Sequence, residues 1–299
     1  MTTLNSKRWM RAGSFTRFVF LTALNAEPTR SGLMALPLQV PNAPLKLTPL
    51  RELSRRYDAV LCDIWGVLHD GQSAFADAVD ALRRYRAGGG SVMLVTNAPR
   101  SSKDIYPQLA RLGVPRDAFD GIVTSGDVTA RLIAKSPDSP VFHLGPDRDR
   151  SILGGLANPL VDLARAKLCL LTGPLDDAIP NVDVYEHMLV QMRDRDVKMI
   201  CANPDLVVRS GDRMVICAGS IAKRYAQLGG SVLYAGKPEA AIYEEALRKV
   251  ANLEGRAVPK DRILAIGDGL QTDIKGAAQN GFDACFITGG IHSDDFKAA

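Results

Sequence analysis

Cysteine and histidine are scarce in this sequence, and neither is arranged as a binding framework. The five cysteines are odd in number, widely spaced, placed in apolar strand-like runs and without a CxxC pair. This pattern argues against a disulfide framework and against a cysteine zinc site. The four histidines form no HxxH or HExxH group, so a histidine metal site is not expected. We expect the cysteines to be small buried side chains in a reducing compartment, and the protein to be cytoplasmic.

The sequence also lacks a large charge excess, a long apolar run and a dinucleotide-binding fingerprint. The net charge is +4 over 299 residues and the basic residues are dispersed, which indicates solvated helix faces and no nucleic-acid partner. No apolar run approaches the roughly 18 residues that a membrane-spanning helix needs, so no membrane partner is expected. No GxGxxG follows the first strand-like run, which disfavours a nicotinamide-dependent oxidoreductase. The composition, 46% hydrophobic and 23% charged, is typical of a soluble globular protein.

Residues 1–47 differ in composition from the rest of the chain. They are rich in Arg, Ser and Thr, contain one acidic residue, Glu27, and include a short apolar run from Phe18 to Leu24. Three interpretations stay open: a signal peptide, an organelle transit peptide that would change the location, and a disordered leader. We expect the segment to contribute little to the core, so that its removal changes stability by no more than about 1 kcal/mol.

Four stretches of the remaining chain place polar residues at the ends of strands or next to a helix. Asp63 follows the buried-strand pattern AVLC, and Thr96 and Asn97 close the run VMLVTN. Lys237 stands just before a helix, and Asp268 ends the run ILAIGD, with Asp273 five positions later. In open parallel sheets, ligands and catalytic groups gather at the C-terminal ends of strands.

The order of these four stretches resembles the four motifs of the haloacid dehalogenase-like (HAD) phosphohydrolase superfamily, class IIA. The resemblance covers roughly Tyr57 to His292 and includes the signatures TSGD, ANPDLVV and AGSIAKRY. One position departs from the family pattern. The phosphatases of the family have Asp two residues after the nucleophile, and this chain has Trp65.

The alternation of strands and helices predicts an α/β fold, a doubly wound parallel sheet. The resemblance implies an α/β cap domain inserted between the second and third motifs. We expect residues 48–139 and 210–299 to form the core and residues 140–209 to form the cap, with the strand SVLYAG back in the core. Within the cap, Asn203 and Asp205 close a strand and could face the substrate, although a turn role explains them equally well. Family members usually continue through another helix and strand after the last strand seen here.

The resemblance implies a reaction on a small-molecule phosphate ester. Asp63 would be the nucleophile and would form an aspartyl phosphate. Thr96 would hydrogen-bond a phosphoryl oxygen beside Asn97, and Lys237 would neutralise charge there.

The resemblance also implies a Mg²⁺ cofactor, which suits carboxylate and carbonyl oxygens. Its ligands would be Asp63, Asp268 and the backbone carbonyl of Trp65, with Asp273 orienting Lys237 or a metal-bound water. Without the other motifs, Asp268 and Asp273 would be read as acidic residues that complement a helix dipole.

Trp65 leaves the choice of function open. The family's Asp at this place protonates the leaving group and activates water, which raises the reaction rate by about 10²- to 10⁴-fold. The indole of Trp65 can do neither. His69, four residues later, could substitute, but a structural role explains a loop histidine as well.

The first interpretation is a Mg²⁺-dependent phosphatase of low or specialised activity. The alternatives are a phosphate-ligand-binding or regulatory protein and a non-phosphatase HAD enzyme, such as one that cleaves carbon–halogen bonds. A homo-oligomer is compatible with the sequence, which does not identify the substrate.

Overall fold

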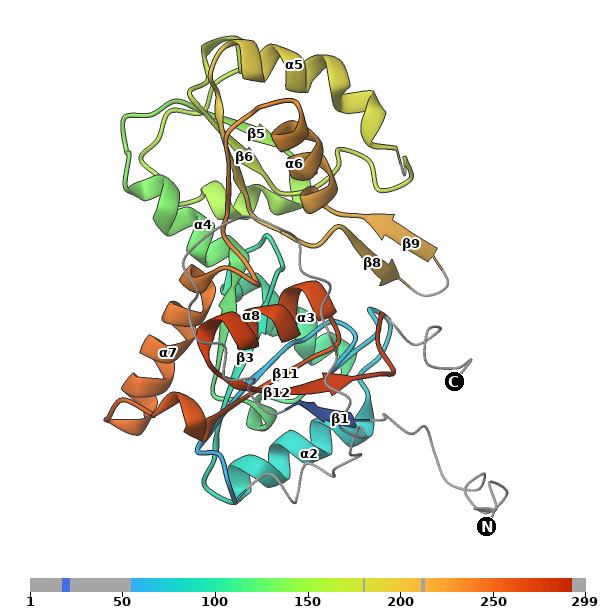
Figure 1. Cartoon of the computed structure of the whole chain (residues 1–299), viewed down its shortest axis with the longest axis vertical. Helices are drawn as coiled ribbons and strands as arrows, with labels where there is room; N and C mark the ends of the chain where they lie inside the picture. The colour runs from blue at the N-terminus through green and yellow to red at the C-terminus, as the bar shows by residue number, and fades with distance from the viewer. Residues whose placement is uncertain (1–17, 22–54, 180, 211–212, 292–299) are drawn as a thin grey trace, which may run out of the picture.

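The computed structural model describes residues 18–21, 55–179, 181–210 and 213–291. These residues form two α/β units, one above the other along the long axis of the molecule (Figure 1). The lower unit is built on a six-stranded sheet and the upper one on a four-stranded sheet. The predicted α/β class and the inserted second unit are therefore confirmed, and we call the two units the core and the cap.

The core sheet has the strand order β1-β12-β11-β2-β3-β4, and all its pairings are parallel except that of β1 with β12. Its strands are β1 (Phe18–Leu21), β2 (Ala59–Cys62), β3 (Ser91–Thr96), β4 (Gly121–Thr124), β11 (Ile263–Gly267) and β12 (Asp283–Ile287). Every residue of β2, β3, β11 and β12 is buried, as expected for parallel strands covered on both faces. From β2 the chain continues to β3 on one side, while β11 lies on the other. The strand order therefore reverses beside β2, and open α/β sheets bind ligands at such a point.

Helices cover both faces of the core sheet. Their bounds are α2 (Ala76–Ala87), α3 (Ser102–Leu112), α4 (Ser125–Ala134), α7 (Ala240–Glu254) and α8 (Lys275–Asn280), with short helices η2 (Arg116–Ala118), η6 (Lys260–Arg262) and η7 (Leu270–Ile274). Leu82 of α2 and Leu109 of α3 pack in the hydrophobic cluster on one face. Ile242 of α7 and Ala277 of α8 pack in the cluster on the other. The two clusters pack both faces of the sheet and so support the loops at its edge.

The cap sheet is parallel and has the order β10-β7-β6-β5. Its strands are β5 (Val141–Leu144), β6 (Leu168–Leu171), β7 (Lys198–Cys201) and β10 (Val232–Tyr234), and its helices are α5 (Glu186–Asp194), α6 (Ala218–Gln227), η3 (Asp147–Leu153), η4 (Leu163–Arg165) and η5 (Val182–Tyr185). An antiparallel hairpin, β8 (Val207–Ser210) and β9 (Arg213–Ile216), leaves the cap at the level where the two units meet (Figure 1). The hairpin thus lies next to the cleft between cap and core.

The predicted cap boundary at residue 209 is wrong. Strand β10 pairs with β7 of the cap sheet, and Ile221 and Tyr225 of α6 pack in the cap cluster with Leu189. The cap sheet therefore extends to Tyr234, and the chain returns to the core only after it. A short apolar strand after a helix has the same sequence pattern whichever sheet it joins, because pairing is decided by long-range contacts. The second crossing between cap and core therefore follows Tyr234 and does not lie near Arg209.

The expectation for the leader is also partly wrong. Residues 18–21 form strand β1, which pairs antiparallel with β12 from Phe18 opposite Ile287 to Leu21 opposite Ala284. The apolar run FVFL suits an edge strand, and it covers the outer edge of β12. Removal of this strand should therefore lower the free energy of unfolding by more than the small change expected from the sequence. The other residues of the 1–47 segment lie outside the described part of the chain.

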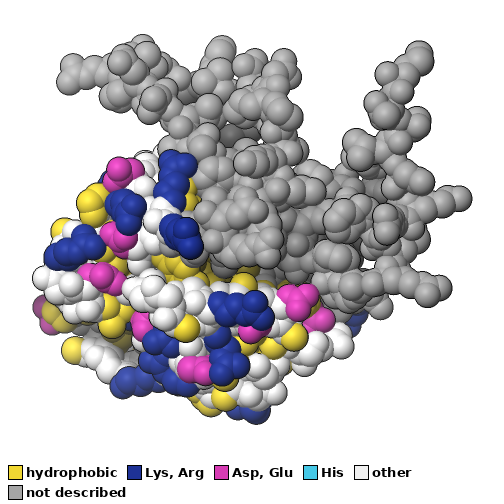
Figure 2. All heavy atoms as spheres, turned by 90° about the horizontal axis from the view of Figure 1, so that it is seen from below, with side chains coloured by type: hydrophobic (Ala, Val, Ile, Leu, Met, Phe, Trp, Pro, Cys, Tyr) yellow, Lys and Arg dark blue, Asp and Glu magenta, His cyan; other side chains and the backbone are white. Residues whose placement is uncertain are grey.

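Charges of both signs are mixed on the core surface. Figure 2 shows Lys and Arg side chains interspersed with Asp and Glu on the face seen from below the core. Exposed ion pairs such as Arg83 with Asp117 and Arg84 with Asp80 contribute to this mixture. In the described ranges, no helix has the length and apolar character needed to cross a membrane.

One buried carboxylate joins two core helices and gives a stability prediction. Glu245 of α7 pairs with Arg248 one turn later and with Arg131 of α4 at 2.6 Å. Burial alone would raise the pKa of Glu245, but hydrogen bonds from Arg248 and Arg131 outweigh it and lower the pKa to about 2. A carboxylate whose folded pKa is lowered stabilises the fold above its unfolded pKa, and this contribution is lost as pH falls towards the folded pKa.

We expect Glu245→Gln to lower the free energy of unfolding at pH 7 by about 2 kcal/mol, after a discount for the half-exposed guanidinium groups. The difference from wild type should shrink as the pH falls from about 5 towards 3, as measured by urea unfolding. The exposed neighbour Glu244 offers a control, since Glu244→Gln should change little. A loss that is the same at pH 3 and pH 7 would contradict the ionic origin.

Candidate active site

The C-terminal ends of three neighbouring core strands bring the predicted polar residues together. Asp63 follows β2, Thr96 ends β3 and Asn97 comes directly after it, and Asp268 follows β11. All four are buried and line a cavity of about 480 Å³, which we call the catalytic cavity. Parallel strands present their carboxyl ends at one edge of the sheet, so the pairing of β11 with β2 and of β2 with β3 is sufficient to gather them.

Gly66 allows the loop after β2 to approach the loop after β11. Its φ of +79° is in the left-handed region, and a Cβ at this position would lie 2.1 Å from Oδ2 of Asp268. No other residue type meets both conditions without strain. The turn also holds the backbone after Asp63 close to Asp268, where a metal ion would lie.

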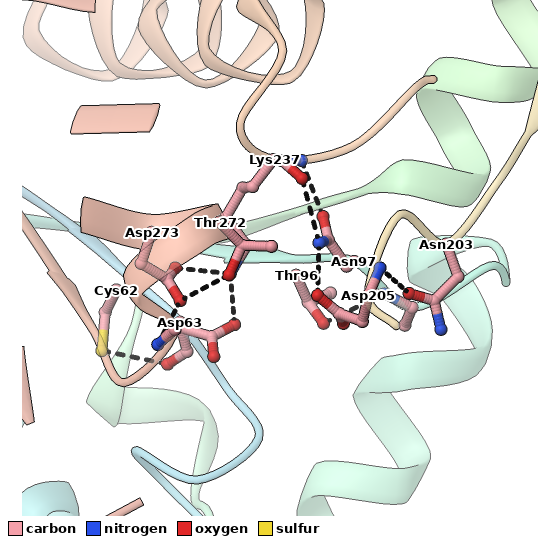
Figure 3. Close-up of polar contacts among 11 residues, drawn as sticks. Cys62, Asp63, Thr96, Asn97, Asn203, Asp205, Lys237, Thr272 and Asp273 are labelled. Carbon is pink, nitrogen blue, oxygen red and sulfur yellow. Dashed lines mark hydrogen bonds and ion pairs between the residues drawn. The ribbon is translucent and has the colours of Figure 1, made fainter. Parts of the chain in front are cut away.

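Lys237 enters the cavity from the loop between β10 and α7. Its Nζ donates to Oδ1 of Asp63 at 2.6 Å and to Oδ1 of Asp273 at 2.7 Å, and all three side chains are buried. Figure 3 shows Asp63 and Asp273 on one side of the site and Asn97 on the other. Burial would lower the pKa of Lys237, but Asp273 and Asp63 outweigh it and raise the pKa well above its ordinary value. The ammonium group therefore stays charged.

Three carboxylates share this part of the cavity. Ligand oxygens of Asp63, Asp268 and Asp273 all lie within 4.8 Å of one another. Burial raises the pKa of Asp63 well above its ordinary value and that of Asp268 to about 7. The neighbouring carboxylates of the trio add to both shifts. Among the described residues, Lys237 is the one cation in an ion pair with this trio, so a second cation is needed for all three carboxyl groups to be ionised together. An oxygen-only donor set of this kind fits a hard divalent cation such as Mg²⁺.

Asn97 links three segments of the chain. Its Oδ1 accepts from the backbone N–H of Lys237 at 2.7 Å, and its Nδ2 donates to Oδ1 of Asp205 at 2.8 Å. Asp205 belongs to the cap, in the loop after β7, and its own N–H donates to Oδ1 of Asn203 at 3.1 Å. The amide of Asn97 therefore joins a core strand end, the lysine loop and the cap (Figure 3).

A second cavity of about 320 Å³ lies between the core and the cap, and we call it the cap cavity. Core residues such as Arg100 and Gln108 line one side, and cap residues such as Arg148 and Asp149 line the other. Asn203 lines this cavity and is not among the residues around the catalytic cavity. The space beside the strand ends is thus large enough for the organic part of a small ester.

Trp65 and His69 lie together in the loop after β2. Their rings are 5.2 Å apart and nearly perpendicular, at 76°. Nδ1 of the buried His69 accepts from the N–H of Gly71 at 3.1 Å, and burial lowers the pKa of His69. His69 borders the cap cavity and not the cavity that holds Asp63. The structure therefore gives His69 a role in the turn and does not bring it to the nucleophile.

Comparison with known proteins agrees with this geometry. Residues 60–156 match a family model described as haloacid dehalogenase-like hydrolase, and residues 234–298 match a HAD-hydrolase-like model. A solved haloacid dehalogenase-like hydrolase from Brucella suis 1330 is 46% identical, with a TM-score of 0.80, over 83% of this chain and 95% of that one. The chain belongs to the haloacid dehalogenase-like hydrolase family. The class IIA relationship expected from the motifs is confirmed as well.

Two further members of the family are similar over most of the chain. The D-glycerol 3-phosphate phosphatase of Mycobacterium tuberculosis is 25% identical over 268 residues, which span 82% of this chain and 66% of that protein. A solved glycerol phosphate phosphatase from the same species, in complex with magnesium, is 23% identical with a TM-score of 0.60, over 77% of this chain and 68% of that one. At this identity the second comparison shows a shared HAD fold.

Some residues around the catalytic cavity were not foreseen from sequence. The loop after β12, with Gly289, Gly290 and Ile291, lines the cavity, and the N–H of Ile291 donates to Oδ2 of Asp268 at 2.7 Å. Thr272, before Asp273, lines it too. The signal was present, because β12 is another buried strand followed by a glycine-rich turn. The turn from Gly289 to Ile291 contains no charged residue, so the sequence pattern predicts a last strand and gives no sign of a site there.

Proposed function

We propose that this HAD hydrolase is a Mg²⁺-dependent phosphatase that acts on a small phosphate ester through an aspartyl phosphate on Asp63. The observation that carries the proposal is the pair of contacts from Nζ of Lys237 to Asp63 and Asp273 in one buried cavity. A charged lysine held 2.6 Å from the nucleophile can neutralise phosphoryl oxygens where the carboxylate attacks. The mycobacterial relative that is named for its action on D-glycerol 3-phosphate supports this substrate class.

The residues divide the reaction between them. An oxygen of Asp63 attacks phosphorus and displaces the leaving oxygen. Lys237 and the hydroxyl of Thr96 hold the phosphoryl oxygens, and Asn97 fixes the backbone of Lys237 by accepting its N–H. A water then attacks the aspartyl phosphate and releases inorganic phosphate, which returns Asp63 to its first state.

Asp63, Asp268 and the backbone carbonyl of Trp65 would hold the Mg²⁺ ion. Asp273, which lies within the carboxylate trio and accepts from Lys237, would orient that lysine or a water on the metal. When bound, the ion supplies positive charge to the phosphoryl oxygens. The magnesium complex of the mycobacterial phosphatase is in line with this choice of metal.

Trp65 restricts the activity. No proton donor lies where the family's phosphatases have one. Unless another acid faces the leaving oxygen, we expect low activity or a preference for esters whose leaving group needs no proton. The same feature favours the second candidate, a protein that binds a phosphate ligand without turning it over. The chelation experiment below separates the two.

We expect protein freed of metal with EDTA to hydrolyse p-nitrophenyl phosphate at least about 10²-fold more slowly than protein given millimolar Mg²⁺. Asp268→Asn should prevent the recovery at the same Mg²⁺ concentration, because it removes one of three carboxylates. Asp261→Asn is the matched control, since Asp261 is exposed at the opposite end of β11. Full turnover in EDTA would contradict the metal dependence. Saturable phosphate binding without turnover of any ester would favour the ligand-binding candidate.

A further inference from the structure

Phosphate ester hydrolysis at this site needs a proton donor near the leaving oxygen, and Trp65 cannot provide it. The two cavities identify where that oxygen lies. The catalytic cavity would hold the phosphoryl group and the cap cavity the organic part, so the bond between them crosses the junction of the two. Four residues line both cavities: Trp65, Thr96, Asp205 and Val208.

Asp205 is the one carboxylic acid among these four. Its Oδ1 accepts from Nδ2 of Asn97 at 2.8 Å, which holds the carboxyl group against the end of β3. Its backbone N–H is bound to Oδ1 of Asn203, which holds the loop after β7 in place. One carboxyl oxygen is therefore engaged with the core, and the other can carry a proton. Desolvation raises the pKa of Asp205 from its ordinary value, with Lys237 and Asn97 opposing it, which favours a carboxyl group able to hold that proton.

The other acids and bases nearby are less suitable. Oδ1 of Asp70 accepts from the N–H groups of Gln72 and Ser73, which stabilise its ionised form and lower its pKa. Asp149 is buried in the cap cavity but does not border the catalytic cavity. His69 also borders only the cap cavity, and its Nδ1 is occupied by the N–H of Gly71.

We propose that Asp205, a cap residue, is the general acid and base of this enzyme in place of the acid that Trp65 replaces. The proposal rests on the phosphatase function proposed above. In the first step Asp63 forms its bond to phosphorus as the phosphorus–oxygen bond of the ester breaks, and the proton of Asp205 passes to the leaving oxygen to give an alcohol. In the second step Asp205 takes a proton from the attacking water as the bond between phosphorus and Asp63 breaks. Inorganic phosphate leaves, and Asp205 is protonated again.

A consequence is that proton transfer depends on the position of the cap. Asp205 reaches the junction only while the cap sits over the strand ends, where the contact between Asn97 and Asp205 joins the two units. Ester cleavage that needs a proton is therefore coupled to cap closure, which also excludes bulk water from the aspartyl phosphate.

The test compares two leaving groups in Asp205→Asn, which keeps an oxygen acceptor for Asn97. We expect kcat/KM for glycerol 3-phosphate to fall by about 10²-fold or more, because an alkoxide must be protonated as it leaves. We expect kcat/KM for p-nitrophenyl phosphate to change by less than about 5-fold, because nitrophenolate leaves without a proton. The kcat for the nitrophenyl ester should drop and the aspartyl phosphate should accumulate, since water has lost its base.

Two variants serve as controls for this test. Asp194→Asn removes an exposed cap carboxylate, paired with Arg193 on α5, and should leave both esters unchanged. Asp205→Glu keeps a carboxyl group and should retain at least about 10-fold more glycerol 3-phosphate turnover than Asp205→Asn. Melting temperatures close to that of wild type show that the variants are folded.

Equal losses of kcat/KM for both esters in Asp205→Asn would overturn the proposal, because Asp205 would then position substrate without transferring a proton. Unchanged kinetics on both esters would overturn it too, and in either case the phosphatase function would stand. A wild-type protein that hydrolyses nitrophenyl phosphate but no member of a panel of alkyl phosphates would overturn the proposal as well, because no acid would then protonate an alkoxide. Should wild type hydrolyse neither ester in Mg²⁺, the phosphatase function itself would fail, and the role of Asp205 with it.

Discussion

Replacing Asp63 by asparagine is expected to lower the turnover of phosphate esters by about 10⁴-fold or more, while phosphate binding changes only a few-fold. The amide keeps the shape of the side chain, and its oxygen can still accept from Nζ of Lys237, but it cannot form the acyl phosphate. Initial rates with p-nitrophenyl phosphate in Mg²⁺ give the first quantity. Calorimetric titration with inorganic phosphate gives the second.

A matched control exists at the other end of the same strand. Asp58 precedes β2, is paired with Arg262 and Arg256, and lies away from the catalytic cavity. Asp58→Asn should retain its activity and lose at most about 1 kcal/mol of stability, as for partly exposed ion pairs. In wild type, rapid quenching during turnover should give a phosphorylated peptide that contains Asp63. Turnover by Asp63→Asn above a hundredth of the wild-type rate would exclude Asp63 as the nucleophile.

Replacing Lys237 by methionine should reduce kcat/KM by about 10³-fold, because it removes the donor that neutralises the phosphoryl oxygens. It should also change the stability of the fold. The three buried carboxylates would lose the one cation that pairs with them in the described part of the chain, and breaking a buried ion pair costs about 3–5 kcal/mol. We therefore expect the free energy of unfolding in EDTA to fall by about 3 kcal/mol and to recover largely in excess Mg²⁺, which binds the folded state.

Urea unfolding of Lys237→Met with EDTA and with Mg²⁺ measures this effect directly. Lys103→Met is the control, since Lys103 is exposed on α3 and should show neither the loss nor the metal dependence. If Lys237→Met unfolds like wild type in EDTA, the carboxylates are not held together by the lysine, and the charge balance described for the site is wrong.

The strand-end residues could be predicted because each carries a local signal. Asp63, Thr96 and Asp268 each follow an uninterrupted apolar run, and a run of that kind is a buried parallel strand whose end lies at the binding edge of the sheet. Lys237 follows the short run SVLYAG, and Asp273 lies five residues after Asp268; their roles follow from their order relative to the other motifs. The structure brings all five to one cavity.

The expectations that failed concern long-range pairing. The pattern of β10 does not say which sheet it joins, and the apolar run at Phe18 does not say that the edge of β12 is open to it. Both questions are decided by which strand edge is free after the rest of the chain has folded. That information is spread over residues distant in the sequence.

The fold class, the family and the residues at the strand ends follow from the sequence alone, because buried runs, turns and motif order are local properties of the chain. The tertiary structure alone decided the extent of the cap, the place of His69 away from Asp63, and the position of Asp205 where the two cavities meet. Asp205 and Asn97 are 108 residues apart in the chain, and only the docking of the cap on the core brings them to 2.8 Å. Proton transfer depends on distances of this kind between separate units, and no spacing in the sequence encodes them.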